Sequence, residues 1–411
     1  MRRIVLILPS STYRATDFVD AASELGAEVV VASDKEQALA GLMGDRALRV
    51  RLDDPEVAAA RIVERAERLP VDAVVAVDDL GVEAAALAAT RLGLPHNPPE
   101  AVAATRDKAR LRAVLAEAGI AQPAWQLAAP GDDVAEQAAA VGLPCVLKPR
   151  SLSMSRGVIR ADTPAQARTA ADRIRAILAD AGASPDEALL VEEFVPGPEV
   201  ALEGLLRGGG LEVLALFDKP DPLDGPYFEE TLYVTPSRQS ASAQREVDEL
   251  VRAATKAVGL CEGPIHAEAR LGARGPILLE VAARSIGGLC SRALRFGAGI
   301  SLEEVILRHA AGLPLDDLSR ADAASGVLML PIPRAGRLVE VRGVDAARAL
   351  PGVLDVRITI ARGKRVRPLP EGDRYLGFVF ARAADPAGVE DALRAAHERL
   401  EVVIDADPAP R

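Results

Sequence analysis

The sequence predicts a fold that joins the α/β and α+β classes, with a doubly wound parallel-sheet domain first and an α+β domain last. Residues 3–33 hold an apolar strand, an amphipathic segment and a second apolar strand, which is the order of a parallel βαβ unit. After residue 319, short strands follow one another with few helices, a pattern typical of an α+β domain. Because 411 residues exceed one ordinary core, we expect three domains, at 1–98, 99–318 and 319–411.

The first domain is expected to contain three strands and two helices. Its strands are the apolar runs IVLIL, EVVVAS and VDAVVAV, and its helical patterns are TDFVDAASELGA and the alanine-rich DDLGVEAAALAATRLGL. The proline cluster PHNPPE then ends the domain. No GxGxxG sequence follows the first strand, so a dinucleotide-binding fingerprint is absent.

The remaining elements follow from the same periodicities. The expected helices are 107–120, 163–182 and 386–400. The expected strands are 143–149, 188–195, 326–332, 336–343, 355–361 and 375–382. The sequence has no repeat at a solenoid period and no low-complexity tract.

Composition limits the classes of function. A hydrophobic content of 49% with 27% charged residues is that of a globular protein, and a net charge of −11 argues against general affinity for nucleic acid or an anionic membrane. The first ten residues hold too short an apolar run for a signal peptide, and no run approaches the ~18 residues of a membrane span. Cys145, Cys261 and Cys290 show no CxxC spacing, which favours a reducing compartment. We therefore expect a cytoplasmic protein with small-molecule partners, and the sequence leaves its assembly open, a homodimer included.

Two glutamates stand out in the segment PIHAEARLGARGPILLEVAARSIGG, residues 264–288. If residues 273–275 form a three-residue hairpin loop with glycine last, Glu268 and Glu280 fall opposite each other on the paired strands. Alternation then gives the hairpin one apolar face and one polar face. The apolar face carries Ile265, Ala267, Ala269, Leu271, Ile277, Leu279 and Val281, and the polar face carries His266, Glu268, Arg270, Leu278, Glu280 and Ala282.

Two opposed carboxylates repel each other, which costs on the order of 0.2 to 1 kcal/mol when they are solvated and more when they are buried. A divalent cation removes this repulsion, and magnesium typically takes few carboxylates together with substrate phosphates. A solvated acidic face is the alternative interpretation, because glutamates are mostly exposed. The hairpin alone leaves both interpretations open.

Two further segments could belong to a nucleotide site. Lys148 ends an apolar strand and precedes the serine-rich loop 151–157, whose amides could hold phosphates although the Walker pattern is absent. In VEEFVPGPEV, backbone groups around Glu193 and Val195 could contact an adenine edge, with Glu199 on the ribose hydroxyls. An ordinary surface turn and a charged Pro-Gly loop are the respective alternatives.

Taken in this order, the segments resemble the ATP-grasp superfamily over most of the chain. The shared pattern is an Asp-Lys pair that opens a helix, a strand lysine with a small-residue loop, an EEFxxGxE motif, and an acid pair followed by arginine. It is matched at Asp107 and Lys108, at 148–157, at 192–199, and at Glu268, Glu280 and Arg284. More narrowly, the stretches PEGDRYLGFVFARA and LEVAARSIGG resemble the L-amino-acid ligases and related carboxylate–amine ligases.

The resemblance implies ATP and Mg²⁺ as ligands and gives each motif a role. Glu268 and Glu280 would be the magnesium ligands, and Arg284 would be the catalytic residue that stabilises charge on an acyl phosphate. The implied nucleotide-binding residues are Lys108, Lys148, Ser155, Gly157, Glu192, Glu193, Val195 and Glu199, with the two lysines on the phosphates.

Two positions depart from the family pattern. Many members have asparagine two residues after the second metal acid, where this chain has Ala282. Some amino-acid ligases place a histidine in a segment like FEETLYVTPS, where this chain offers Tyr233. We assign no catalytic role to His266. Asp78 and Asp79 follow a strand and could face a ligand crevice, although a helix cap is expected of one of them.

The function implied by the resemblance is an ATP-dependent ligase. A carboxylate would be activated as an acyl phosphate and coupled to an amine to give a dipeptide or similar amide, with release of ADP and phosphate. This chemistry needs positioning and charge neutralisation more than a protein nucleophile. The alternatives are an ATP-grasp enzyme of the purine-biosynthesis or carboxylase branch, which the lack of a biotin-like acceptor motif disfavours, and a non-catalytic nucleotide sensor.

Overall fold

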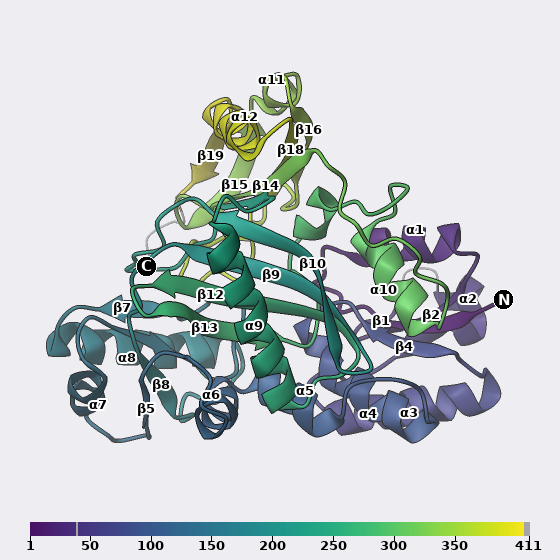
Figure 1. The fold of residues 1–411 in the computed structure, drawn as a ribbon, viewed down its shortest axis with the longest axis horizontal. Helices are drawn as coiled ribbons and strands as arrows, with labels where there is room; N and C mark the ends of the chain where they lie inside the picture. The colour runs from purple at the N-terminus through teal and green to yellow at the C-terminus, as the bar shows by residue number, and fades with distance from the viewer. Residues whose placement is uncertain (38–39, 407–411) are drawn as a thin grey trace.

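The structure, a computed structural model, describes residues 1–37 and 40–406. Its framework is a four-stranded parallel sheet, a four-stranded antiparallel sheet, an eight-stranded antiparallel sheet and a three-stranded sheet. In Figure 1 the eight-stranded sheet lies in the middle, between the N-terminal part and the four-stranded antiparallel sheet. None of the described helices is both long enough and apolar enough to cross a membrane.

The N-terminal domain is a doubly wound parallel sheet, as predicted, with strand order β3-β2-β1-β4. Its strands are β1 (Arg3–Ile7), β2 (Glu28–Ser33), β3 (Ala47–Arg49) and β4 (Ala73–Ala76), and its helices are α1 (Ala15–Glu24), α2 (Ala40–Met43), α3 (Pro55–Arg68) and α4 (Val82–Leu92). Side chains of β1 alternate between two clusters: Leu6 packs with Phe18 of α1, and Ile7 packs with Ile62 of α3. Strand β3 and helix α3 lie between residues 34 and 70, where the sequence pattern predicts no element.

Residues 121–194 form a small lobe, which we call the lid lobe. Its antiparallel sheet has the order β5-β8-β6-β7. The strands are β5 (Trp125–Ala128), β6 (Cys145–Lys148), β7 (Ile159–Ala161) and β8 (Leu189–Glu193), and the helices are α7 (Val134–Val141) and α8 (Pro164–Asp180). The two helices pack on the sheet around one apolar cluster that includes Leu147 and Ile174.

The central sheet has the order β13-β12-β9-β10-β11-β14-β18-β16, and every neighbouring pair is antiparallel. The strands are β9 (Glu199–Arg207), β10 (Gly210–Lys219), β11 (Leu232–Thr235), β12 (Gly263–Gly272), β13 (Gly275–Ala282), β14 (Ala324–Leu330), β16 (Val353–Ile358) and β18 (Gly377–Ala383). Helix α9 (Ala241–Val258) crosses one face of this sheet (Figure 1), because its buried residues recur at helical spacing. The other helices near the central sheet are α5 (Pro99–Arg106), α6 (Lys108–Glu117) and α10 (Leu302–Ala310).

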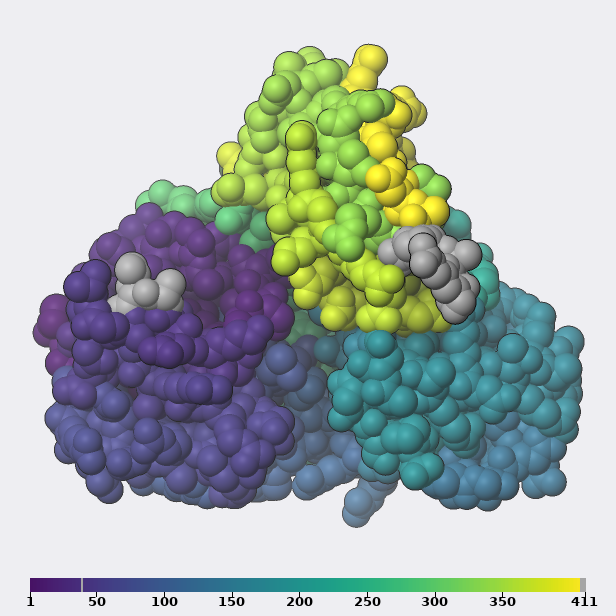
Figure 2. Space-filling view, turned by 180° about the vertical axis from the view of Figure 1, so that it is seen from behind, coloured from purple at the N-terminus to yellow at the C-terminus, as the bar shows by residue number. Residues whose placement is uncertain are grey.

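The C-terminal part extends the central sheet. The domain boundary expected after residue 318 falls between α10 and β14, but β14 pairs with β11 across that boundary. A smaller sheet of β17 (Arg365–Val366), β15 (Gly336–Arg342) and β19 (Glu401–Asp405) follows, with α11 (Val344–Arg348) and α12 (Pro386–Glu398). Figure 2 shows the yellow-green C-terminal part seated across both the purple N-terminal domain and the blue-teal lid lobe. Every helix and strand expected from the sequence is present, with ends shifted by a few residues.

The acid hairpin has the predicted register but reaches it by a different route. Gly272 pairs with Gly275, so the loop has two residues and the predicted three-residue loop is wrong. A bulge then inserts Leu279 as an extra residue on β13. The bulge compensates for the shorter loop, and Glu268 pairs with Glu280 as predicted.

The bulge exchanges two leucines between the faces of the hairpin. Leu278, predicted on the polar face, packs in the core, while Leu279, predicted in the core, lines a cavity. Arg112 donates to the Leu279 carbonyl at 2.6 Å, which gives a partner to an acceptor at the bulge. The predicted faces of β13 are therefore wrong for Leu279 and for the residues between Leu278 and the turn. The predicted pairing of Glu268 with Glu280 is unaffected.

Candidate functional site

An open cavity lies between the lid lobe and the central sheet, and the space within it is about 740 Å³ when the adjoining solvent is included. Its walls come from β6, β8, β12 and β13 and from the loop that follows β6, so distant parts of the sequence meet there. The predicted site residues in its lining are Lys108, Lys148, Ser155, Glu192, Glu193, Val195, Glu199, Glu268 and Glu280. Gly157 and Arg284 do not line it.

Lys148 is held at the cavity wall by a buried acid. Its Nζ lies 2.6 Å from Glu192, and Arg112 Nε donates to the same carboxylate at 2.6 Å. Burial opposes ionisation of Glu192, but the charges of Arg112 and Lys148 outweigh it and lower the pKa of Glu192 to about 2. Glu192 therefore stays ionised and fixes the position of Lys148.

Lys108 opens α6, and the side chain of Asp107 caps this helix by accepting two N–H groups of its first turn. Lys108 Nζ donates to the Leu152 carbonyl of loop 151–157. Burial lowers the pKa of Lys108. Two lysines and the loop thus meet in one cavity, an arrangement suited to phosphate groups.

The loop itself has an unusual backbone. Met154 and Ser155 both line the cavity with left-handed φ values of 60° and 54°, which residues other than glycine rarely adopt. Gly157 has a φ of 74°, and its N–H donates to the Pro370 carbonyl at 3.0 Å. The Gly157 amide thus has a partner in the C-terminal part, and its role as a nucleotide contact stays a prediction.

Residues 193–195 offer backbone groups to the cavity. The Glu193 N–H donates to the Ala124 carbonyl at 2.8 Å, and the Val195 carbonyl accepts from Arg270 at 2.8 Å. Val195 is buried, and within residues 1–37 and 40–406 its N–H has no hydrogen-bond acceptor. Because an unpaired buried donor is costly, a ring nitrogen of a bound base would fit this position.

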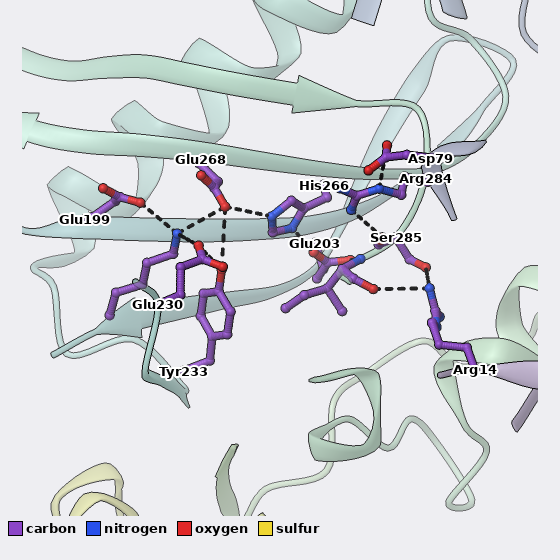
Figure 3. Close-up of polar contacts among 12 residues, drawn as sticks. Arg14, Asp79, Glu199, Glu203, Glu230, Tyr233, His266, Glu268, Arg284 and Ser285 are labelled. Carbon is purple, nitrogen blue, oxygen red and sulfur yellow. Dashed lines mark hydrogen bonds and ion pairs between the residues drawn. The ribbon is translucent and has the colours of Figure 1, made fainter. Parts of the chain in front are cut away.

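Three carboxylates surround the ammonium group of Lys219 (Figure 3). Lys219 Nζ lies 2.7 Å from Glu199 and 3.1 Å from Glu268, and it also pairs with Glu230. One oxygen from each glutamate lies within 4.8 Å of the other two. Burial opposes the charge on Lys219, but the three acids outweigh it and hold the pKa of Lys219 well above its ordinary value.

His266 joins Glu268 to a second acid, Glu203. Its Nε2 lies 3.1 Å from Glu268, and its Nδ1 pairs with Glu203 (Figure 3). Burial disfavours the imidazolium, but Glu203 and Glu268 raise the pKa of His266 to about 10. Glu203 also accepts the Ile286 N–H at 2.9 Å, so one buried acid connects the histidine to the segment that follows β13.

Glu280 differs from Glu268 in having no partner. Within the residues that the structure describes, its carboxylate makes neither a hydrogen bond nor an ion pair, although it lines the cavity beside Glu268. An acid pair with one open carboxylate fits a divalent cation, and Glu268 and Glu280 would hold it. Ala282 pairs with His266 on the neighbouring strand and offers no ligand atom.

Arg284 lies beside the cavity and pairs with the N-terminal domain. Its Nε is 2.8 Å from Asp79 (Figure 3). Asp79 also lies 3.3 Å from Arg106. Burial would raise the pKa of Asp79, but Arg284 and Arg106 hold it far below its usual range. The Asp78 side chain makes no cap on the turn that it precedes. The crevice interpretation of Asp78 and Asp79 stays a prediction.

Sequence reasoning missed Lys219, Glu203 and Glu230 as parts of this site. Glu199 and Glu203 are four residues apart on β9 and therefore share a face, a spacing that was readable in EVALEG. No comparable spacing in the sequence around Lys219 indicated that it belongs to the site. Tyr233, found where a histidine was sought, donates to Glu230 at 2.7 Å.

The chain is similar to known protein families. Family models match residues 141–293 as an ATP-grasp domain, 19–96 as an ATP-grasp N-terminal domain and 328–405 as an L-amino acid ligase C-terminal domain 2. The chain therefore contains an ATP-grasp domain and has the ATP-grasp fold. The crystal structure of an L-amino acid ligase from Bacillus licheniformis superposes with a TM-score of 0.83 at 23% identity, over 98% of this chain and 99% of that one.

Two curated relatives are similar in sequence. Uncharacterized protein y4rH of Sinorhizobium fredii is 28% identical over 314 residues, covering 75% of this chain and 63% of the relative. The alanine–anticapsin ligase of Bacillus subtilis is 26% identical over 269 residues, covering 61% of this chain and 56% of the relative. The matched region thus spans less than two thirds of the length of either relative.

Proposed function

We propose that this protein is an ATP-dependent carboxylate–amine ligase that uses Mg²⁺. It activates a carboxylate as an acyl phosphate and couples it to an amine, with release of ADP and phosphate. The observation that carries the proposal is the meeting of Lys108, Lys148 and the opposed pair Glu268 and Glu280 in one cavity. Cationic groups for phosphates and an acid pair for a metal are the parts that phosphoryl transfer requires.

Each residue has a task in this reaction. Lys108 and Lys148 bind phosphate oxygens, the Val195 N–H and the backbone near Glu193 hold the base, and Glu199 lies where ribose hydroxyls would bind. Bound Mg²⁺ would neutralise charge on the transferring phosphate. Because the cation and the lysines are fixed before reaction, little reorganisation is needed as charge develops.

Arg284 stabilises the acyl phosphate in this proposal. In the ligand-free chain its guanidinium pairs with Asp79, and the charge of Asp79 raises the pKa of Arg284 above its ordinary value although burial opposes this. The pair keeps a permanent cation next to Glu280. A small movement of the side chain would carry it to an anionic intermediate.

The substrates are proposed to be amino acids. The relative in Bacillus subtilis is named for joining alanine to anticapsin, and the C-terminal part matches a domain named for L-amino acid ligases. Both names favour this branch over the purine-biosynthesis and carboxylase branches, and the acid pair with Arg284 favours an enzyme over a sensor. A cytoplasmic location fits the three unpaired cysteines, and a homodimer stays a prediction.

A screen of phosphate release over pairs of amino acids tests the proposal. We expect release above the ATP-only rate for particular pairs, and only with Mg²⁺. Glu280→Gln should abolish the pair-dependent release while leaving the fold intact. Release that is independent of every amino acid, or equal in the variant, would overturn the proposal.

A further inference from the structure

The segment between β17 and β18 leaves the C-terminal part and lies against the lid lobe. We call residues 367–375 of this segment the strap. The Pro370 carbonyl accepts the N–H of Gly157 at 3.0 Å, so the strap makes a backbone hydrogen bond to the end of loop 151–157. A backbone contact of this kind fixes the loop without regard to its side chains.

Ion pairs hold the strap on both sides of that contact. Arg173 of α8 makes a bidentate pair with Glu371, at 2.6 and 3.0 Å. Asp180 at the end of α8 binds Arg367 at 2.8 Å and Arg156 at 2.7 Å, so one carboxylate joins the strap to the loop.

The strap has a tight turn that sets its shape. The Gly372 N–H donates to the Pro368 carbonyl at 2.8 Å, and a Cβ on Gly372 would lie 2.3 Å from the Arg367 carbonyl oxygen. Only glycine fits there. Beyond the turn, Tyr375 reaches the acid cluster, where its hydroxyl donates to Glu230 at 3.4 Å. The strap thus runs from the loop to the interior of the site.

The loop needs support from outside itself. The backbones of Met154 and Ser155 adopt left-handed conformations that are rare for residues other than glycine. The loop also has few apolar side chains that could anchor it. Such a conformation persists only where neighbouring structure holds it. The strap contacts Gly157 directly, and it is joined to Arg156 through the shared carboxylate of Asp180.

We propose that the strap holds loop 151–157 in its nucleotide-binding shape before ATP arrives, with Glu371 as a positioning residue. The inference rests on the proposed function, since it takes the loop to bind phosphates. If the loop is preformed only while the strap is docked, then releasing the strap lowers the competent fraction and weakens apparent nucleotide affinity by that fraction. The turnover rate at saturating ATP should change little.

Glu371→Gln tests this directly because it removes the charge and keeps the shape. Asp133→Asn is a matched control: Asp133 makes a bidentate pair with Arg168, on the same helix as Arg173, at 2.8 and 2.6 Å, within the lid lobe. Affinity for a nonhydrolysable ATP analogue with Mg²⁺ is measured by calorimetry. Amide hydrogen exchange of residues 151–158 is measured without nucleotide.

We expect Glu371→Gln to raise the nucleotide Kd by roughly three- to fivefold, the scale of a partly exposed ion pair, and to speed exchange in the loop. Asp133→Asn should change neither quantity. The double exchange Arg173→Glu with Glu371→Arg should restore slow exchange, although each single change speeds it.

Loop exchange in Glu371→Gln that equals the wild-type rate would overturn the inference. A wild-type protein that binds no ATP analogue would instead overturn the proposed function. The exchange comparison, made without nucleotide, would still decide whether the strap holds the loop.

Discussion

Glu268 and Glu280 are paired residues in opposite situations. Glu268 is held by Lys219 and His266, whose charges keep its pKa well below the ordinary range despite burial. Glu280 has no partner in the described chain and faces the cavity. In the proposed reaction, Glu268 would therefore serve both structure and metal binding, whereas Glu280 would serve metal binding alone.

This difference predicts separate effects for two isosteric substitutions. Glu280→Gln should abolish ATP turnover, by at least ~10²-fold, with an unchanged melting temperature, because it removes a ligand and no internal contact. Glu268→Gln should lose turnover and also destabilise the fold by roughly 1–3 kcal/mol, since the buried cations Lys219 and His266 each lose one of their charged partners. Phosphate release and thermal melting measure the two effects. Equal melting temperatures for both variants would contradict the assignment.

His266 gives a prediction for pH. Its folded pKa is about 10 against an ordinary value of 6.5, so the folded state binds the proton more tightly than the unfolded state. The stability from this proton is fully present below about pH 6.5 and is lost as the pH rises toward about 10.

The stability difference between wild type and His266→Gln should therefore be largest near neutral pH and below. It should shrink as the pH rises through this window. Urea unfolding in the presence of a chelator measures it without interference from magnesium. A difference that stays constant from about pH 6 to about pH 10 would show that the histidine is neutral in the folded protein.

At the scale of elements, the hairpin shows what a sequence can and cannot predict. Alternation and the glycine-bounded turn placed Glu268 opposite Glu280, and this pairing is confirmed. The loop length and the bulge at Leu279 were not predicted, and their effects on the register cancel. A bulge depends on partners such as the Arg112 guanidinium, which comes from a helix far away in the sequence. The local periodicity of the hairpin therefore could not predict that contact.

Gly157 provides a prediction at the same scale. Alanine at a left-handed φ costs roughly 1–2 kcal/mol, and its Cβ would lie 3.2 Å from Pro149. Gly157→Ala should therefore raise the Kd for ATP by about 5- to 30-fold. Gly182→Ala is the matched control, because Gly182 has a φ of 73° but lies at the end of α8 with nothing within 4 Å of a Cβ. Calorimetric Kd values that are equal in the two variants would contradict a role for the loop in binding.

At the scale of the whole molecule, the site is assembled from parts that are remote in sequence. Buried Arg14 of the N-terminal domain binds the Ser285 hydroxyl at 2.9 Å (Figure 3). It also binds the Ile286 carbonyl at 3.1 Å and Glu303 at 2.8 Å. The segment after β13 is thus fixed from outside the central sheet. This explains why the motifs predicted much of the cavity lining, whereas Arg14, the strap and the continuity of the sheet past residue 318 were not predicted. A motif reflects only the local sequence, whereas the contacts of Arg14 and of the strap depend on how distant segments pack together.

We propose that the protein activates a carboxylate before an amine attacks it. Hydroxylamine should intercept the acyl phosphate and give a hydroxamate that depends on ATP, Mg²⁺ and the correct amino acid. Arg284→Ala should lose this product by ~10²–10³-fold, the scale for one preorganised charge stabiliser, while ATP affinity changes far less. If no acid in a broad panel of amino acids and organic acids gives hydroxamate while ATP still binds tightly, the ligase account is contradicted and the chain is a nucleotide sensor.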